Sequence, residues 1–250
     1  MIPIGLQLYS VREDAAKDLA GVLAAVAKMG YTGVEFAGYY GHSATDVRKM
    51  LDDNGLICCG GHIGIDNLLP ENFDATVEYQ RTLGNRFLIV PGLSPQWNGS
   101  REAWLNTAKT LNEIADKLEP HGMRTGYHNH HTEFIPFPGT EELPWDLFFG
   151  NTTDKVIMQF DTGNAMHGGA EAGPFLRRYP GRAATVHLKE YSPTDSKALV
   201  GEGDVKWAEI FELCETVGKT EWYVVEQESY AYTPLECADR CLKNLRAMGK

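Results

Sequence analysis

Residues 156–188, VIMQFDTGNAMHGGAEAGPFLRRYPGRAATVHL, decide the fold expected for this chain. The stretch begins with a short apolar run, continues through a Gly-rich loop and a helical segment at 174–179, and ends in a second short apolar run. Such runs on either side of a helical pattern indicate two buried parallel strands joined by a crossover helix. Asp161 follows the first run directly, and His187 lies near the end of the second. This β/α unit therefore places an ionisable residue at each strand end.

The same alternation extends in both directions from this unit. Eight predicted strands cover residues 4–9, 33–36, 56–62, 86–90, 123–127, 156–160, 184–188 and 222–225. Helical patterns lie between them, among others at 19–29, 44–53, about 71–83, and from Asp204 to 217. Eight parallel β/α units fit either a closed barrel or an open doubly wound sheet. No G-x-G-x-x-G or P-loop follows the first strand, which disfavours the open nucleotide-binding sheet. We predict a single-domain (β/α)8 TIM barrel over residues 1–250.

The charge, apolar runs and cysteines of the sequence indicate which classes of binding partner and which cell compartment to expect. The net charge of −11 and the absence of basic runs disfavour nucleic acid, which is bound by basic surfaces. The first residues lack the pattern of a secretory signal, and no apolar run approaches the length of a membrane span. The five cysteines include no CxxC pair, which is typical of a reducing compartment. The sequence predicts a cytoplasmic protein without a nucleic-acid or membrane partner.

Ionisable side chains follow most of the predicted strands. The C-terminal ends of barrel strands meet at one mouth, where the loops that carry active sites also lie. The ionisable residues at or just after these ends are Glu35, His62, His128, His130, Glu133, Asp161, His187 and Glu226. Uncompensated buried charges are costly, and a divalent cation would compensate several carboxylates and imidazoles at once. Because the donors are oxygen and nitrogen, we predict one Mn²⁺, Mg²⁺, Co²⁺ or Zn²⁺ ion.

Six segments, in order along the chain, resemble the xylose-isomerase-like superfamily of sugar (phosphate) isomerases and epimerases. They are GLQLYSVR (5–12), GYTGVE (30–35), GYHNHHTEF (126–134), FDTGN (160–164), VHLKE (186–190) and VVEQE (224–228). Members of that family typically bind one metal ion through Glu, Asp, His and Glu from strands five to eight. The resemblance implies that Asp161, His187 and Glu226 are the last three ligands, and the residue types at the strand ends point to the same three.

The fifth strand departs from the family pattern. His128 stands where the ketose epimerases place a liganding glutamate, and the next glutamate is Glu133. Either Glu133 reaches back to the metal or His128 is itself the ligand; we favour Glu133, which keeps three carboxylates and one histidine. The YHNHxxEF form is similar to a branch with inosose-dehydratase-like proteins and lyases or hydratases of 3-keto-sugars.

The resemblance implies proton abstraction next to a metal-polarised carbonyl, through an enediolate. Imidazole titrates near neutral pH and a lysine can stabilise an enolate oxygen, so we predict catalytic roles for His128, His130, Lys189 and Glu226. A salt bridge to nearby glutamates is the alternative role of Lys189. Substrate hydroxyl groups are expected to contact Tyr9, Glu35, His62, Asn164, His167 and Glu228.

The predicted function is that of a metal-dependent sugar isomerase or epimerase. A lyase or dehydratase of a keto-sugar or keto-inositol is the alternative, because an enediolate can also expel a β-leaving group. An apurinic-site endonuclease-like enzyme and a non-catalytic sugar-binding barrel are less favoured. The expected partner is a small carbohydrate or polyol, and the sequence is compatible with a homo-oligomer.

Overall fold

Eight parallel strands close into a barrel in the order β1-β2-β3-β4-β5-β6-β7-β8, with β8 paired to β1. This computed structural model describes residues 1–250. The strands are β1 (Ile4–Gln7), β2 (Gly33–Phe36), β3 (Ile57–His62), β4 (Phe87–Val90), β5 (Arg124–His128), β6 (Ile157–Asp161), β7 (Thr185–Leu188) and β8 (Trp222–Val225). The predicted (β/α)8 barrel is confirmed.

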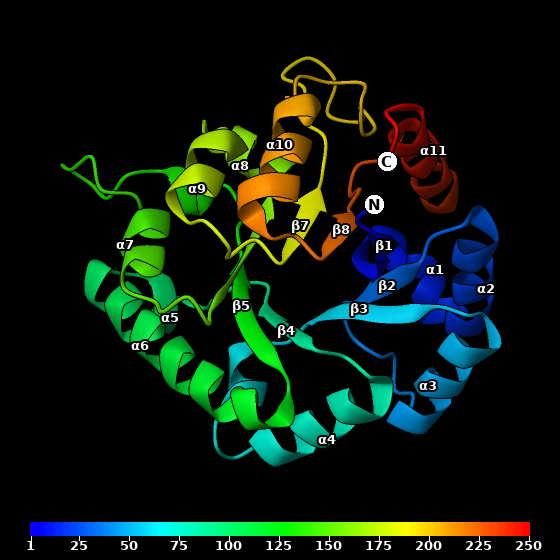
Figure 1. The fold of residues 1–250 in the computed structure, drawn as a ribbon, viewed down its shortest axis with the longest axis horizontal. Coiled ribbons are helices and arrows are strands. Elements are labelled where there is room, and N and C mark those ends of the chain that lie inside the picture. Colours follow the sequence, from blue (N-terminus) through cyan, green and yellow to red (C-terminus); the bar gives the residue numbers. More distant parts are fainter.

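Helices surround the strands (Figure 1). They are α1 (Arg12–Lys17), α2 (Leu19–Met29), α3 (Ala44–Asp53), α4 (Phe73–Leu83), α5 (Pro95–Asn98), α6 (Arg101–Leu118), α7 (Pro144–Gly150), α8 (Thr162–His167), α9 (Ala172–Arg178), α10 (Trp207–Leu213) and α11 (Pro234–Ala247). Segments of 3₁₀ or π helix are η1 (Leu8–Val11), η2 (Ile65–Leu68), η3 (Glu119–His121), η4 (Thr132–Phe134) and η5 (Cys214–Gly218). None of the helices combines the length and apolarity needed to span a lipid bilayer.

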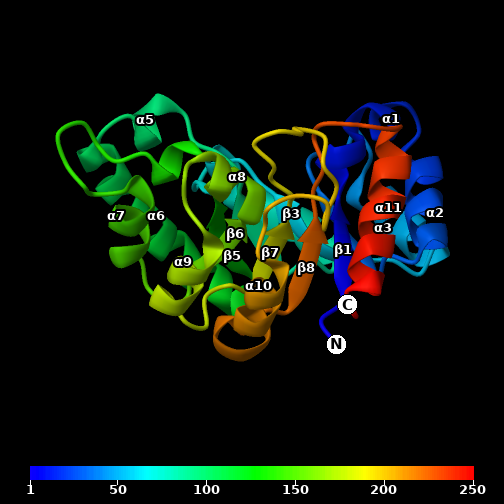
Figure 2. The same cartoon turned by 90° about the horizontal axis from the view of Figure 1, so that it is seen from above.

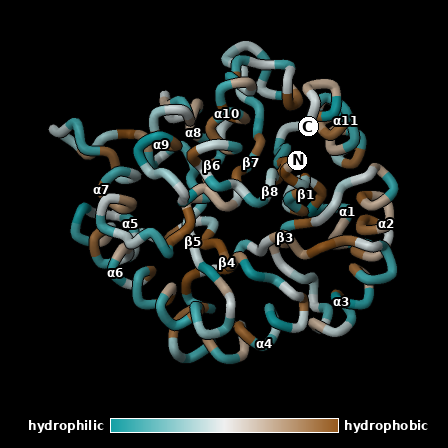
Figure 3. The backbone as a smooth tube through the Cα atoms, viewed as in Figure 1, coloured by the Kyte–Doolittle hydropathy of each residue, from teal (hydrophilic) through white to brown (hydrophobic).

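Side-chain alternation along the strands separates an outer apolar layer from a barrel interior that holds a small apolar cluster (Phe87, Ile89, Ile157 and Ala184) and, toward the strand ends, polar side chains. On β6, Met158 and Phe160 belong to a core of 61 buried residues, which also includes buried side chains of the surrounding helices. Ile157, Gln159 and Asp161 occupy the other parity of the strand, which faces the barrel interior. In Figure 3 hydrophobic residues are prominent at β4 and β5, and hydrophilic residues recur along the helices at the periphery.

The C-terminal ends of the strands place the ionisable residues together. Asp161 pairs in register with His187, and His128 pairs with Gln159. The chain termini lie close together at the opposite end of the barrel, where the strands begin (Figure 2). The strand-end residues therefore meet at one mouth.

Most boundaries match the sequence prediction, with three corrections. The first strand, predicted over residues 4–9, ends at Gln7, because the side chain of Gln7 accepts the backbone N–H of Tyr9 and the chain turns into η1. The helices α2 and α3 have the predicted bounds. The predicted start of a helix at Asp204 is wrong: the backbone N–H of Asp204 donates to the carbonyl of Tyr191, and α10 begins only at Trp207. The Gly-rich segment after β6, expected to be a loop, forms α8, because the Asp161 carboxylate accepts a hydrogen bond from the backbone N–H of Asn164 and caps the helix.

Candidate active site

Four buried side chains converge at the mouth of the barrel. His128 ends β5, Asp161 ends β6, His187 lies on β7, and Glu226 follows β8 directly. One donor atom from each of them lies within 4.8 Å of a donor atom of every other. Two carboxylates and two imidazoles in this arrangement form a donor set that suits a divalent transition-metal ion.

Two atoms of this group lack any hydrogen-bond partner although they are buried. They are Nδ1 of His128 and Oδ2 of Asp161. The other oxygen of Asp161 is occupied, because it accepts the N–H of Asn164 at 2.6 Å. An unsatisfied buried polar group costs about 1–3 kcal/mol, and more when it is charged. A cation between these two atoms would supply both missing partners, so the residues present fit a divalent ion.

The pKa values of these four residues are shifted because their ionisable groups are buried close together. Burial raises the pKa of Asp161 to about 7. Burial would lower the pKa of His187, but the carboxylates of Glu35 and Glu226 raise it to about 10. Burial and the neighbouring imidazoles hold the pKa of His128 well below its usual value, so that this ring is neutral. Protons therefore occupy donors that a metal ion would bind, and ion binding would release them.

Lys189 contacts two carboxylates beside this group. Its Nζ lies 3.2 Å from Oε1 of Glu226 and also contacts Oε2 of Glu228. Burial would lower the pKa of Lys189, but Glu226 and the other nearby carboxylates hold it above its usual value. The lysine is thus a permanent positive charge in a salt bridge, next to a predicted metal ligand.

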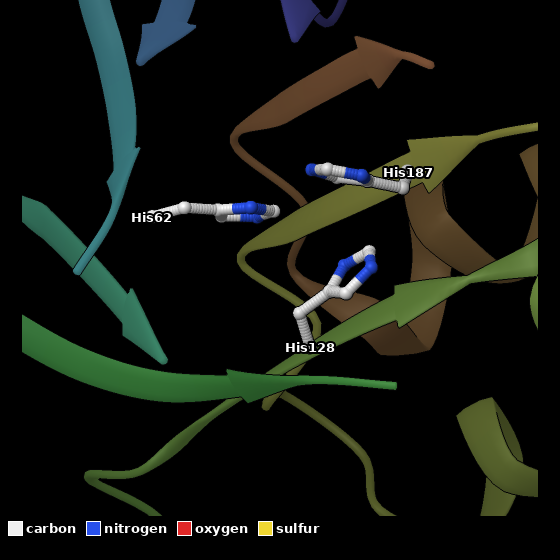
Figure 4. Close-up of side chains that lie close together, drawn as sticks. All are labelled: His62, His128 and His187. Carbon is white, nitrogen blue, oxygen red and sulfur yellow. The ribbon is translucent and has the colours of Figure 1, made fainter. Parts of the chain in front are cut away.

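A cavity of about 440 Å³ opens above these residues. It is lined by Tyr9, Ala37, Gly38, His62, Pro91, His128, His130, Glu226 and Glu228. Figure 4 shows the imidazole rings of His62, His128 and His187 close together. The ring centroid of His62 lies 4.9 Å from that of His128 and 5.3 Å from that of His187. The volume is within the usual range for small-ligand sites.

A second cavity of about 400 Å³ adjoins the first, because Glu228 lines both. Asn164, His167 and Lys189 line it, together with polar residues of the loop between β7 and α10. His167 is exposed and stacks on His131 at a centroid distance of 4.8 Å. The residues expected to contact substrate are therefore divided: Tyr9 and His62 line the first cavity, whereas Asn164 and His167 line the second.

The structure does not bring Glu133 to the four-donor group. Its Oε1 accepts the hydroxyl of Tyr127 at 2.5 Å, and its Oε2 accepts the backbone N–H of His130 at 3.0 Å and the hydroxyl of Thr132 at 3.1 Å. Glu133 is buried, and these bonds hold the short segment that follows β5. The preference for Glu133 over His128 as the fifth-strand ligand therefore finds no support in this arrangement.

Glu35 also occupies a different place from the expected one. Its side chain is fully buried and does not line either cavity. The carboxylate accepts hydrogen bonds from Gln7 at 2.8 Å, from Gln159 at 2.7 Å and from Nε2 of His187 at 2.5 Å. Glu35 therefore contacts Nε2 of the His187 imidazole inside the barrel and has no direct access to a substrate in these cavities.

Three amide side chains of the site were missed by the sequence reasoning: Gln7, Asn129 and Gln159. The side-chain oxygen of Asn129 accepts the backbone N–H of Asp161 at 2.8 Å, and its Nδ2 donates to the Asp161 carbonyl at 3.0 Å. Strand parity could have found Gln7 and Gln159, because each is a polar residue on the interior face of an apolar strand. The sequence contained no comparable signal for Asn129.

Comparison of the chain with known protein families identifies one family that matches it. The family model described as xylose isomerase-like TIM barrel matches residues 23–248. A sugar phosphate isomerase/epimerase from Parabacteroides distasonis has a similar structure, with a TM-score of 0.84, 24% identity and coverage of 98% of this chain and 96% of that chain. A D-allulose 3-epimerase from Methylomonas sp., solved with D-allulose, has a TM-score of 0.71 at 14% identity and covers 98% and 96% of the two chains.

Among curated proteins, the chain is similar to inosose dehydratases. The inosose dehydratase of Serratia proteamaculans is 26% identical over 242 aligned residues, which cover 81% of this chain and 80% of the relative. Similarity therefore extends over most of both chains.

Proposed function

Because the chain belongs to the xylose isomerase-like TIM-barrel family, we propose that it is a divalent-metal-dependent enzyme acting on a small keto-sugar or keto-polyol. It removes a proton from the carbon next to the carbonyl group. The observation that carries this proposal is the pair of unpartnered buried atoms, His128 Nδ1 and Asp161 Oδ2, within a four-donor group. In this proposal His128, Asp161, His187 and Glu226 hold the ion, so His128 replaces Glu133 in the ligand set favoured from the sequence.

When bound, a divalent cation supplies Lewis acidity that polarises a carbonyl group and acidifies the neighbouring C–H bond. The chain supplies the proton carriers. Glu226 and His130 line the same cavity from β8 and β5, which lie three places apart around the barrel, so they reach a ligand from different sides. Lys189, held charged by Glu226, stabilises negative charge that develops on a substrate oxygen. His62 offers a further imidazole to the same cavity.

The enolate formed by such a step has two fates. We favour elimination of a β-hydroxyl group, as in a dehydratase, because several of the curated relatives are named inosose dehydratases. In addition, the fifth strand offers imidazole where the epimerases that this sequence resembles carry a second liganding glutamate. Isomerisation or epimerisation, the function favoured from the sequence, is the second candidate, because Glu226 and His130 can act from two sides of a substrate.

Proton NMR of a panel of keto-sugars and keto-inositols in D₂O, with Mg²⁺ or Zn²⁺, tests the shared step and the two fates together. We expect the C–H signal next to the carbonyl group to disappear as deuterium replaces hydrogen. New vinylic or enol signals would accompany dehydration, and a shifted ring-proton pattern would accompany epimerisation. Absence of exchange for every compound with every metal ion would contradict the proposed reaction.

Metal uptake is the second expectation that follows from this site. We expect about one divalent ion per chain in metal analysis after loading, and its loss on chelation. An ion that binds only the folded state at about 100 times its Kd stabilises it by about 2.7 kcal/mol, so Tm should rise clearly on addition of Mn²⁺. A preparation that binds no ion and shows an unchanged Tm would contradict the metal site.

The geometry also favours one ion over several, because the other group of possible donors, His62, His128 and His187, shares His128 and His187 with the four-donor group. In the neighbouring group, Glu35 accepts from Gln159 and from Nε2 of His187, and Nε2 of His62 donates to Gln159, so each of these atoms has a partner within the chain. Glu35 and His62 contain no unpartnered buried atom comparable with those of His128 and Asp161. Together with the net charge of −11, this disfavours the multi-metal, DNA-binding site of an apurinic-site endonuclease. The presence of all four donors disfavours a non-catalytic sugar-binding barrel.

A further inference from the structure

Behind the proposed metal site lies a buried hydrogen-bond network centred on Glu35. The carboxylate is fully buried and receives three donors, from Gln7 on β1, Gln159 on β6 and His187 on β7. A glycine at position 60 makes room for it, since a Cβ atom there would lie 2.4 Å from Oε1 of Glu35. The network thus joins side chains of four strands beneath the cavity floor.

The position of Glu35 determines which nitrogen of His187 is free for an ion. Nε2 of His187 lies 2.5 Å from Oε2 of Glu35, and a carboxylate can only accept, so Nε2 carries a proton. The other nitrogen, Nδ1, faces the proposed ligands, 2.7 Å from Oε2 of Glu226 and 4.0 Å from Oδ2 of Asp161, so in the metal-free protein it also carries a proton, which it donates to Glu226. An ion held by Glu226 and Asp161 would displace this proton, whereas the proton on Nε2 would stay with Glu35. Metal-binding histidines are commonly held in this way by a carboxylate on the second ring nitrogen, which also raises their basicity.

The same carboxylate orients His62 through Gln159. The side-chain nitrogen of Gln159 donates to Oε1 of Glu35 at 2.7 Å and to the hydroxyl of Thr185 at 2.9 Å. This leaves the side-chain oxygen of Gln159 to accept from Nε2 of His62 at 2.9 Å. In a neutral His62 ring the proton is therefore on Nε2, and the lone pair is on Nδ1.

We propose that Glu35 is a positioning residue that fixes the proton arrangement of two active-site histidines: it presents Nδ1 of His187 to the metal ion and, through Gln159, leaves Nδ1 of His62 as a proton acceptor. This inference rests on the proposed metal site. It assigns to Glu35 a role without substrate contact, in place of the hydroxyl binding expected from the sequence.

Calorimetric titration of the metal-free protein with Co²⁺ tests the proposal without any assay of activity. Glu35→Gln keeps the size of the side chain and removes its charge. Changes to the partner of a metal-binding histidine typically weaken metal affinity by about 10–100-fold, and we expect a loss in that range. In the Zn²⁺-loaded wild-type protein, the proton on His187 Nε2 should exchange slowly in ¹H–¹⁵N NMR spectra, and Glu35→Gln should remove that protection.

Glu190→Gln is the matched control. Glu190 is another buried carboxylate at the same end of the barrel, and it accepts the backbone N–H groups of Tyr191, Gly201 and Val205 and the indole N–H of Trp207. It is not among the four proposed donors. We expect Glu190→Gln to lower Tm but to retain Co²⁺ affinity. Equal loss of affinity in both variants would overturn the proposal, since loosening of the barrel mouth would then explain both.

Wild-type affinity in Glu35→Gln would also overturn the proposal and leave the metal site standing, whereas a wild-type protein that binds no Co²⁺ would contradict the site and the inference with it. Should Glu35→Gln fail to fold, Gln7→Met provides the second test. It removes one donor to Oε2 of Glu35 and keeps the carboxylate. A smaller loss of Co²⁺ affinity is expected for this variant, and an unchanged affinity would count against the positioning role.

Discussion

Asp161→Asn is expected to abolish metal binding while the barrel remains folded. The substitution removes an anionic ligand and its charge from a group of four, so we expect Co²⁺ or Mn²⁺ affinity to fall by more than about 100-fold, or about 2.7 kcal/mol. Asparagine is as good a helix N-cap as aspartate, so the bond to the N–H of Asn164 that begins α8 can persist. Calorimetric titration measures the affinity, and circular dichroism and Tm measure the fold.

The metal-free variant should be at least as stable as metal-free wild-type protein at neutral pH. Burial raises the pKa of the Asp161 carboxyl to about 7, so the charged form is disfavoured inside the fold and a neutral amide relieves that cost. Asp161→Ala is the matched control, because it removes both the ligand and the cap. It should lose metal binding and, in addition, about 1 kcal/mol of stability. A collapsed fold with intact metal affinity in Asp161→Asn would identify Asp161 as a structural residue instead.

The second large effect is expected at the end of β5, where His128→Gln should weaken metal affinity by well over tenfold, more than about 1.4 kcal/mol. Nδ1 of His128 is buried without a partner, His128 belongs to the four-donor group, and burial and the neighbouring imidazoles keep the pKa of the ring well below its usual value. Glu133→Gln should leave the affinity nearly unchanged, because Glu133 is already engaged with Tyr127, His130 and Thr132.

Glu133→Gln should instead reduce stability. Hydrogen bonds to a charged group contribute about 1.5–3 kcal/mol each, and the substitution weakens the set that holds the segment after β5. Thermal unfolding of the two variants, together with metal titration, separates the roles. If Glu133→Gln loses the ion while His128→Gln retains it, the fifth-strand ligand is the glutamate that the sequence favoured, and His128 is free to carry protons.

The order of strands and the residues at their ends could be predicted from the sequence because both depend on local patterns. Short apolar runs alternating with helical periodicity predict parallel β/α units, and eight of them fit a closed barrel. Once the barrel is assumed, the C-terminal ends of its strands converge, so Asp161, His187 and Glu226 are expected to meet. The structure brings these three together with His128.

Only the tertiary structure decided which partners the remaining ionisable side chains contact, and therefore which roles they can have. Glu35 and Glu133 are strand-end or near-strand-end carboxylates in the sequence, just as Glu226 is, yet they point to different partners. Glu35 is directed into the barrel, where Gln7, Gln159 and His187 from three other strands meet its oxygens. Glu133 turns back to Tyr127 and to the backbone of its own segment.

The physical reason is that a side chain's role depends on which donors lie within about 3 Å of it, and here those donors come from strands far apart in the sequence. Periodicity along one strand gives the face of a residue but not the contacts across the barrel. The sequence by itself determined the barrel and the mouth at which the ionisable groups gather. The closure of the barrel decided which atoms remain without partners, His128 Nδ1 and Asp161 Oδ2, and these atoms define the candidate metal site.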